Sequence, residues 1–474
     1  MKSSTGEVGK PLTDTKGTPL RFVTGSSLFD GHDAAINMIR RLLQSQGAEV
    51  IHLGHNRSVQ ELVDAAIQED ADGLAVSSYQ GGHNEFFKYM VDELRANNAG
   101  HIQVFGGGGG VILPSEIEAL QAYGVNRIYS PQDGQKMGLE GMIGDMIARA
   151  AQVRDARKKI DTACSPESIK ALANNWPLLT QLITRLERDE VPAADLEVIR
   201  EQAKASKTPV LGITGTGGAG KSSLTDELIR RLRMDHGDDL TIGVVCVDPS
   251  RRKTGGALLG DRIRMNAIGP WAGNGPKVFM RSLATRDSAQ EVPATLPDII
   301  ALCRATGFDV VLIETPGIGQ GDAAIVPHVD FSLYVMTPEY GAASQLEKID
   351  MLDFADFVAV NKFDRKGALD ALRDVCKQVQ RNRMAFTSMP DTMPVYGTLA
   401  SRFNDDGVSA LYKALRAALP IAKPSKGLFD SIDTKHSTTM KAVVPSERVR
   451  YLAEIAQAVR SYKAQVQKDV AAVY

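Results

Sequence analysis

The chain has 474 residues, of which 43% are hydrophobic and 6% aromatic, and its formal net charge is −2. This length predicts two to four domains of roughly 100 to 200 residues each. The near-neutral charge gives no reason to expect nucleic acid or a membrane surface as a partner, and no stretch approaches the roughly 18 apolar residues of a membrane span.

Residues 1–19 are polar and lack the apolar core of a signal peptide, so we expect a disordered N-terminus and a cytoplasmic protein. The four cysteines are scattered without the short spacings of a zinc site or a disulfide framework. We therefore expect free thiols at Cys164, Cys246, Cys303 and Cys376.

Between residues 20 and 150, short apolar runs alternate with segments whose apolar residues recur at helical spacing. The runs predict strands at 20–23, 50–53, 74–77, 102–105 and 127–129. The segments between them predict helices at 34–45, 59–68, 85–96 and 115–122, with a closing helix after residue 132. This order is typical of a flavodoxin-like, doubly wound α/β domain, in which ligands bind outside the carboxyl ends of the strands.

The sequence Asp30-Gly31-His32-Asp33 follows the first of these strands. A carboxylate that accepts a hydrogen bond from one imidazole nitrogen fixes the tautomer and makes the other nitrogen a better metal ligand. Alone, such a pair is more often an ordinary turn. Here Ser77 ends one predicted strand and the glycines at 106–110 follow another, so we expect them on the same rim.

Residues 151–206 form a helical linker region interrupted by Pro192, in which Leu182, Leu186, Leu196 and Ile199 are expected to form one buried face. A second α/β domain follows at 207–420. Its apolar runs predict strands at 210–214, 241–247, 310–314, 331–335, 357–361 and 394–396.

A phosphate-binding loop follows the first strand of this second domain and precedes a helical pattern, which is the context that the motif requires. Glycines let backbone N–H groups converge on phosphate oxygens, the lysine reaches the terminal phosphates, and the serine hydroxyl coordinates magnesium. The residues expected there are Gly215, Gly217, Gly218, Ala219, Gly220, Lys221, Ser222 and Ser223.

The sequence Asn361-Lys362-Phe363-Asp364 follows a later strand of the same domain. An aspartate carboxylate can accept both N–H groups on one edge of guanine, whereas adenine offers no matching pair of donors. We therefore expect all four residues at the nucleotide and GTP as the substrate.

Oxygen ligands for Mg²⁺ are expected between these two motifs. The candidates at or near strand ends, besides Ser222, are Asp248, Asp261, Glu314 and Thr315. Residues 248–264 carry too many charges for a core element, and a solvated loop would account for 251–253.

Three residues are candidates for catalysis: Lys221, Glu314 and Gln320. Gln320 could orient the attacking water, although it could equally be a solvated loop residue. Arg264 could reach the phosphates, since arginine stabilises transferring phosphoryl charge.

Residues 209–420 resemble the metallochaperone GTPases that serve cobalamin-dependent acyl-CoA mutases. The motifs that carry this resemblance are Gly215 to Ser222, Asp248-Pro-Ser, Gly260-Asp261-Arg-x-Arg264-Met265, Glu314-Thr315-x-Gly317-x-Gly319-Gln320 and Asn361 to Asp364. Residues 20–150 are similar to the cobalamin-binding domains of those mutases through Asp30-Gly31-His32. Ala35 and Tyr79 depart from the glycine and leucine of that pattern.

The order of the two domains resembles the front part of the fused isobutyryl-CoA mutases. The resemblance implies that His32 binds the cobalt of adenosylcobalamin in place of the cofactor's own benzimidazole, with Asp30 and Gly31 supporting it. It also implies a slot for the displaced nucleotide tail. The residues that would line this slot are Ser77, Gly106, Gly107 and Gly108.

The fused enzymes continue into a barrel that holds acyl-CoA, and the resemblance implies a homodimer in the complete enzyme. We expect this chain to lack that barrel and to end in a connector and linker helix at 421–474, with a polar part at 421–444 and one apolar helical stripe at 446–474. A terminal helix folded back on its own domain is the other interpretation of the stripe.

The implied function is the cobalamin-binding, GTP-hydrolysing chaperone portion of an enzyme that interconverts isobutyryl-CoA and butyryl-CoA, in which GTP gates cofactor loading or repair. One alternative is a corrinoid carrier or sensor GTPase that acts on a separate mutase. Another is a receiver-like regulatory domain at 20–150 without a cofactor, which leaves a histidine beside five glycines unexplained.

Overall fold

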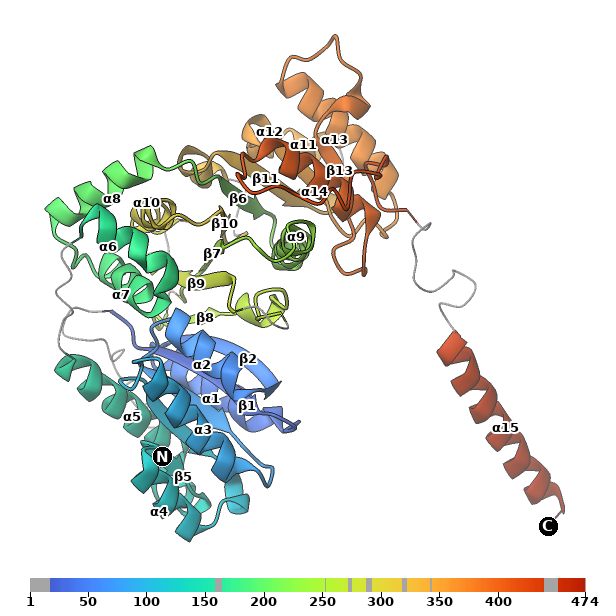
Figure 1. Ribbon diagram of the computed structural model, residues 1–474. Helices are drawn as coiled ribbons and strands as arrows, with labels where there is room; N and C mark the ends of the chain where they lie inside the picture. The colour runs from blue at the N-terminus through green and yellow to red at the C-terminus, as the bar shows by residue number, and fades with distance from the viewer. Residues whose placement is uncertain are drawn as a thin grey trace, which may run out of the picture.

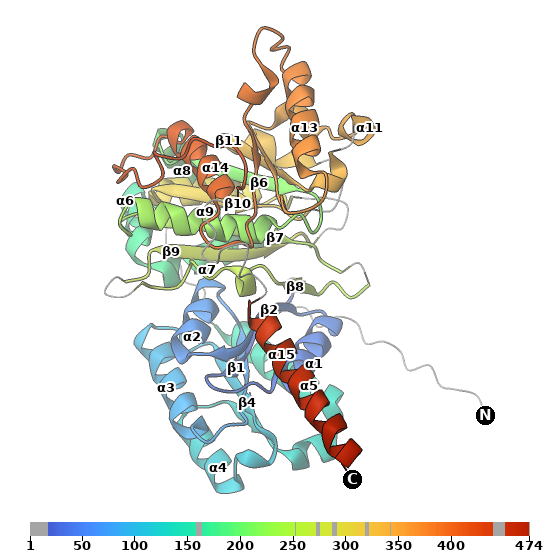
Figure 2. The same ribbon diagram turned by 90° about the vertical axis from the view of Figure 1, so that its right-hand side faces the viewer.

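The computed structural model describes residues 18–157, 164–251, 253–271, 275–286, 292–317, 322–341, 343–438 and 451–473. These residues form two parallel β-sheets with helices on their faces, one sheet above the other in Figures 1 and 2. The predicted α/β class with a doubly wound domain ahead of a phosphate-loop domain is confirmed. The expectation of a disordered N-terminus falls almost entirely outside the described residues.

The first sheet has the order β5-β4-β3-β1-β2-β8, with every neighbouring pair parallel. Its first five strands and their order are those of the predicted flavodoxin-like domain. They are β1 (Arg21–Ser27), β2 (Glu49–Arg57), β3 (Gly73–Ser77), β4 (Gln103–Gly107) and β5 (Arg127–Tyr129), and the helices are α1 (Asp33–Ser45), α2 (Val59–Gln68), α3 (His83–Ala96), α4 (Pro114–Tyr123) and α5 (Pro131–Ala156).

The sixth strand, β8 (Ala257–Leu259), comes from the second half of the chain and pairs with β2. The expectation that 248–264 is too charged for a core element is therefore wrong. Ala257 and Leu259 are fully buried, and the nearby charge of Arg262 is paired: it donates to Glu69 Oε1 at 3.0 Å and to Gln68 Oε1 at 2.5 Å. This added strand also covers an otherwise open sheet edge.

The second sheet has the order β13-β12-β11-β6-β10-β7-β9. Its strands are β6 (Val210–Gly215), β7 (Ile242–Asp248), β9 (Val278–Ala284), β10 (Val310–Glu314), β11 (Phe331–Met336), β12 (Phe357–Val360) and β13 (Val395–Gly397). The sequence did not predict β9, because Arg281 interrupts its apolar run, yet this arginine is buried.

Helices cover both faces of this second sheet (Figure 1). They are α6 (Pro166–Ala171), α7 (Trp176–Glu187), α8 (Ala193–Ala205), α9 (Lys221–Asp235), α10 (Leu296–Thr306), α11 (Ala343–Leu346), α12 (Met351–Phe354), α13 (Ala368–Asn382) and α14 (Asp406–Ala418). The predicted face of Leu182, Leu186, Leu196 and Ile199 packs into one apolar cluster with α10.

Short 3-10 turns complete the regular structure. They are η1 (Gly109–Val111), η2 (Leu172–Asn174), η3 (Arg262–Arg264), η4 (Asp322–His328), η5 (Pro338–Tyr340) and η6 (Pro390–Thr392).

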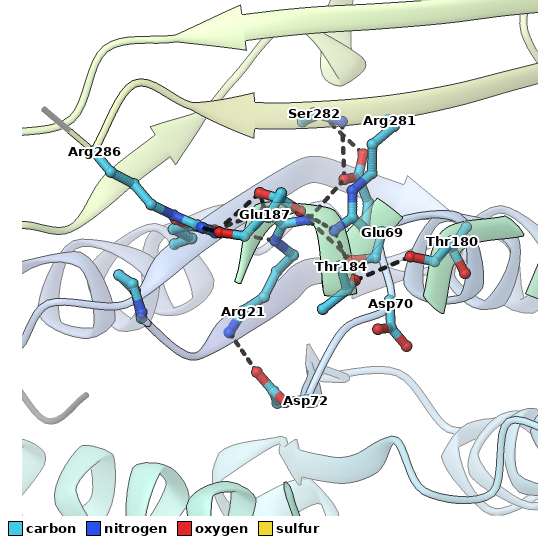
Figure 3. Close-up of polar contacts among 12 residues, drawn as sticks. Arg21, Glu69, Asp70, Asp72, Thr180, Thr184, Glu187, Arg281, Ser282 and Arg286 are labelled. Carbon is cyan, nitrogen blue, oxygen red and sulfur yellow. Dashed lines mark hydrogen bonds and ion pairs between the residues drawn. The ribbon is translucent and has the colours of Figure 1, made fainter. Parts of the chain in front are cut away.

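Buried ion pairs join the two halves of the chain (Figure 3). Arg21 in β1 lies 2.7 Å from Glu49 and 3.1 Å from Glu187 in α7, while Arg286, just after β9, lies 2.7 Å from Glu49. Although burial opposes ionisation, the Arg286 and Arg21 guanidinium groups outweigh it and hold the pKa of Glu49 well below its usual range. Separating the halves would leave buried charges unpaired, which is costly.

The segment 421–438 packs against the second sheet's helices rather than serving only as a polar connector, because Phe429 and Ile432 are buried there. A final helix, α15 (Tyr451–Val473), extends away from both sheets in Figure 1. Its predicted apolar stripe is largely exposed, as at Tyr462 (72%). Within the described residues, every helix is too short or too polar to cross a membrane.

Candidate functional sites on two sheet rims

The predicted pair of Asp30 and His32 lies beyond the carboxyl end of β1. Asp30 is buried, and its Oδ1 lies 2.8 Å from His32 Nδ1, while its Oδ2 accepts the backbone N–H of Tyr79 at 2.7 Å. The side chain of His32 is 74% exposed. Asp30 thus fixes the imidazole so that Nε2 is the nitrogen available to a ligand. Gly31, between them, has open space around its Cα.

A cavity of about 300 Å³ lies between α1, α5 and the ends of β3 and β4, and one of its lining residues, Tyr79, has its ring 5.5 Å from the His32 ring. Its walls are mainly apolar, with Met38 and Leu42 from α1 and Met142 and Met146 from α5. Such walls suit a flat ring system with few polar groups. The part of the cavity lining that α5 contributes was not predicted, although the apolar residues 139, 142, 143 and 146 follow helical spacing.

Glycines at the end of β4 and directly after it line this cavity, and two of them are also required by the protein's own packing. A Cβ at Gly106 would lie 2.6 Å from the Phe87 ring, and one at Gly108 would overlap the Ser78 carbonyl. These two positions therefore need glycine for the protein's own packing. Gly107 does not, because a Cβ there would lie 3.7 Å from its nearest neighbour, the Tyr129 carbonyl.

Ser77 and Tyr79 complete this rim. The Ser77 hydroxyl lies 2.8 Å from that of Ser26 and also borders the cavity. The Tyr79 ring lies 5.5 Å from the His32 ring. The departure from leucine at position 79 therefore places an aromatic ring beside the candidate ligand.

The phosphate-binding loop lies at the corresponding rim of the second sheet, between β6 and α9. Gly215, Gly218 and Gly220 have φ of 141°, 73° and 90°, a region that favours glycine. Lys221 Nζ donates to the Gly215 carbonyl at 3.1 Å. The loop therefore leads directly into the N-terminus of α9, where the positive end of the helix dipole suits an anion.

Acidic side chains surround Ser222, the second residue of α9. The Ser222 hydroxyl lies 2.8 Å from both Asp261 Oδ1 and Glu314 Oε1, and Thr225 donates to Glu314 Oε2 at 2.8 Å. Burial and the charge of Asp261 raise the pKa of Glu314 to about 7. The same two causes raise the pKa of Asp248, whose Oδ2 accepts the Gly260 N–H, to about 8.

Crowded buried carboxylates of this kind would be stabilised by a cation. Yet among the described residues no group of three or more His, Cys, Asp or Glu side chains is arranged to hold a metal ion. A cation at Ser222 would accordingly take one or two side chains of this protein and complete its shell with water and phosphate oxygens, as Mg²⁺ commonly does.

The predicted guanine motif follows β12. Asn361 is buried and donates to the Ala219 carbonyl at 2.8 Å, and its Oδ1 accepts from Thr398 and Ala400. It therefore links the loops that follow β12 and β13 to the phosphate-binding loop. Lys362 has a φ of 58°, and Asp364 is exposed beyond it.

The other residues predicted to bind the nucleotide differ in how exposed their side chains are. The Phe363 side chain is buried and stacked on His436, with ring centroids 5.5 Å apart, so its ring packs within the protein, and the expectation that Phe363 lies at the nucleotide stays a prediction. Arg264 is 65% exposed and lies 3.9 Å from Asp261. Ser223 is exposed and Thr315 is buried, while Gln320 lies outside the described residues.

Comparison with known proteins matches both halves of the chain. Residues 179–465 match the family described as methylmalonyl-CoA mutase-associated GTPase MeaB, and residues 20–132 match the B12 binding domain. A solved structure described as LAO/AO transport system kinase is 21% identical, with a TM-score of 0.37, and covers 66% of this chain and 86% of that one.

Two curated relatives are each called fused isobutyryl-CoA mutase. The protein from Cupriavidus metallidurans is 62% identical over 94% of this chain and 40% of its own length. The protein from Nocardia farcinica is 56% identical over 96% of this chain and 41% of its own length. The chain thus spans about 40% of the length of these relatives.

Proposed function

The chain belongs to the family of methylmalonyl-CoA mutase-associated GTPases and carries a B12-binding domain ahead of the GTPase, and from this premise we propose that it binds adenosylcobalamin and couples GTP hydrolysis to loading or repair of that cofactor. The observation that carries the proposal is the Asp30–His32 pair, with its 2.8 Å contact, whose neighbour Tyr79 also lines the apolar cavity.

The residues of the first rim fit cobalamin. His32 Nε2 would bind cobalt, Asp30 would hold the ring in the required tautomer, and the cavity between α1 and α5 would take the displaced nucleotide tail. Ser77 and the glycines 106–108 line that cavity. The bound cofactor would supply the radical chemistry of a mutase.

The residues of the second rim fit GTP and magnesium. Lys221 and the loop N–H groups would bind the phosphates, Asp364 would accept the two guanine N–H groups, and Ser222 would bind Mg²⁺. Asp261, Glu314 and the more distant Asp248 would balance its charge directly or through water.

The substrates of the whole enzyme follow only from its relatives. We propose that the chain is the cofactor-handling portion of an isobutyryl-CoA mutase, whose substrate barrel would belong to the remaining part of such an enzyme or to a separate chain. The purified 474-residue chain is then expected to hydrolyse GTP and bind cobalamin without isomerising isobutyryl-CoA.

Two measurements on the full chain test this proposal. The absorbance spectrum of adenosylcobalamin should change to the histidine-bound form with the unsubstituted chain and with His55→Ala, which changes an exposed histidine in β2, but not with His32→Ala. Phosphate release should occur with GTP and be much slower with ATP. Normal histidine-bound spectra in His32→Ala, or equal rates with both nucleotides, would contradict the proposal.

A further inference from the structure

Three consecutive residues, Asp261, Arg262 and Ile263, connect the surroundings of the two rims. Asp261 Oδ1 lies 2.8 Å from the Ser222 hydroxyl beside the phosphate loop. Arg262 is buried among side chains at the end of α2. Ile263 packs so closely over β2 that a Cβ added at Gly54 would lie 3.0 Å from its Cδ1. These three residues therefore contact both the phosphate-loop side and the other half of the chain.

The contacts continue from Gly54 to the candidate cobalt ligand. Two residues further along β2, Asn56 Oδ1 accepts the backbone N–H of Phe29 at 2.8 Å. Phe29 immediately precedes Asp30, whose carboxylate holds the His32 ring. Asn56 and Phe29 have φ of 56° and 63°, so both turns have conformations that side-chain-bearing residues seldom adopt. Every step from the phosphate loop to His32 is thus a covalent link or a short contact.

The same segment also contacts the helix that begins directly after His32. Gly256 lies so close to the end of α1 that a Cβ there would overlap the Gln44 carbonyl. The Ala257 N–H donates to the Ala48 carbonyl at 3.2 Å, and the Thr254 hydroxyl donates to Gln44 at 3.3 Å. The β8 segment therefore contacts both elements, β2 and α1, that border the His32 loop.

Nucleotide binding has a direct means of displacing this segment. The Ser222 hydroxyl carries one proton and lies equally close to Asp261 and Glu314, so the two carboxylates compete for it. A cation bound to the Ser222 oxygen would end that competition and would attract the Asp261 carboxylate. Because Asp261 immediately precedes η3, a movement of Asp261 would be passed to Ile263.

We propose that Ile263 and Asn56 are positioning residues through which nucleotide and Mg²⁺ at the phosphate loop change the affinity of His32 for cobalamin. This inference rests on the proposed function, because it requires that both ligands bind. The coupling must be reciprocal, so cobalamin would change nucleotide affinity by the same factor.

The proposal is tested by a coupling factor. This factor is the cobalamin Kd measured with GDP divided by the cobalamin Kd measured with a non-hydrolysable GTP analogue and Mg²⁺. It is measured on the full chain from the histidine-bound absorbance spectrum. We expect about a 5-fold or larger factor in either direction for the unsubstituted chain. Ile263→Ala removes the contact with Gly54, and Asn56→Gly removes the acceptor but allows the positive φ, so each should bring the factor below about 2-fold.

Matched substitutions separate coupling from folding. Ile117→Ala changes another partly buried isoleucine, in α4, and Asn98→Gly changes an asparagine with a φ of 55° after α3. Both should keep the full factor, as should the conservative Ile263→Val. A factor of one in the unsubstituted chain, or an unchanged factor in Ile263→Ala and Asn56→Gly, overturns the inference. Failure to bind either ligand contradicts the proposed function and removes the inference with it.

Discussion

Arg262, from the GTPase half, donates to Glu69 Oε1 at the end of α2 at 3.0 Å, and both side chains are at most 5% exposed. Glu69 also accepts from the backbone N–H and the hydroxyl of Ser282. Buried charges of opposite sign, supplied by two domains, thus satisfy each other at the junction where β8 joins the first sheet (Figure 2).

Arg262→Met should therefore lower the free energy of unfolding by about 3 kcal/mol, since it leaves a buried carboxylate without its main partner. Urea unfolding at pH 7 measures the change. Arg264→Met, two residues away but 65% exposed, is the control and should change the stability by less than about 0.5 kcal/mol. Equal effects of the two substitutions would show that the buried pair does not stabilise the junction.

His52 should make the protein less stable as the pH falls below neutral. It lies buried in β2 with Nδ1 2.9 Å from the Thr24 hydroxyl, and burial, with the charges of Arg40 and Arg57, lowers its pKa from 6.5 to about 4. Between these two values the unfolded chain binds a proton that the folded chain does not bind. Stability attributable to this group is therefore present above pH 6.5 and is lost as the pH falls towards 4.

His52→Gln should consequently show a weaker loss of stability between pH 6.5 and 4 than the unsubstituted chain, measured as urea midpoints at several pH values. His55→Gln, at an exposed position three residues later, should follow the unsubstituted chain. Parallel pH profiles for all three proteins would contradict the assignment of this loss to His52.

The parts of the fold that could be predicted are those specified by short stretches of sequence. The order of apolar runs gave β1 to β5, and a glycine-rich loop between an apolar strand and a helix fixed the place of Lys221 and Ser222. The contact of His32 with Asp30 also follows from their spacing of two residues in a turn.

The parts that could not be predicted depend on partners distant in the sequence. Ala257 to Leu259 become a strand only because β2, some 200 residues earlier, offers a free edge. Arg281 and Arg262 look like solvated residues until their buried carboxylate partners are known. The Phe363 ring similarly takes its place from His436, which follows it by more than 70 residues.

Asp364→Asn should change the nucleotide preference from GTP towards XTP. The aspartate would accept two guanine N–H groups, whereas xanthine has a carbonyl in place of the amino group and can accept from an asparagine N–H. Loss of a hydrogen bond to a charged group predicts a GTP affinity lower by about 10- to 100-fold, measured by competition with a fluorescent nucleotide. Asp370→Asn, exposed in α13, should leave the preference unchanged, and an unaltered preference in Asp364→Asn would exclude its role at the base.

Asp30→Asn should weaken cobalamin binding by about 10- to 100-fold, because outer partners that orient a metal-binding histidine have effects of this size. The amide keeps an oxygen that can accept from Tyr79 or from His32, so the loop can still fold, but it lacks the charge that makes the imidazole a stronger ligand. Spectral titration with adenosylcobalamin measures the affinity. The control is Asp33→Asn, an exposed residue in the first turn of α1, which should bind as the unsubstituted chain does. If both substitutions left the affinity unchanged, Asp30 would serve only to shape the loop.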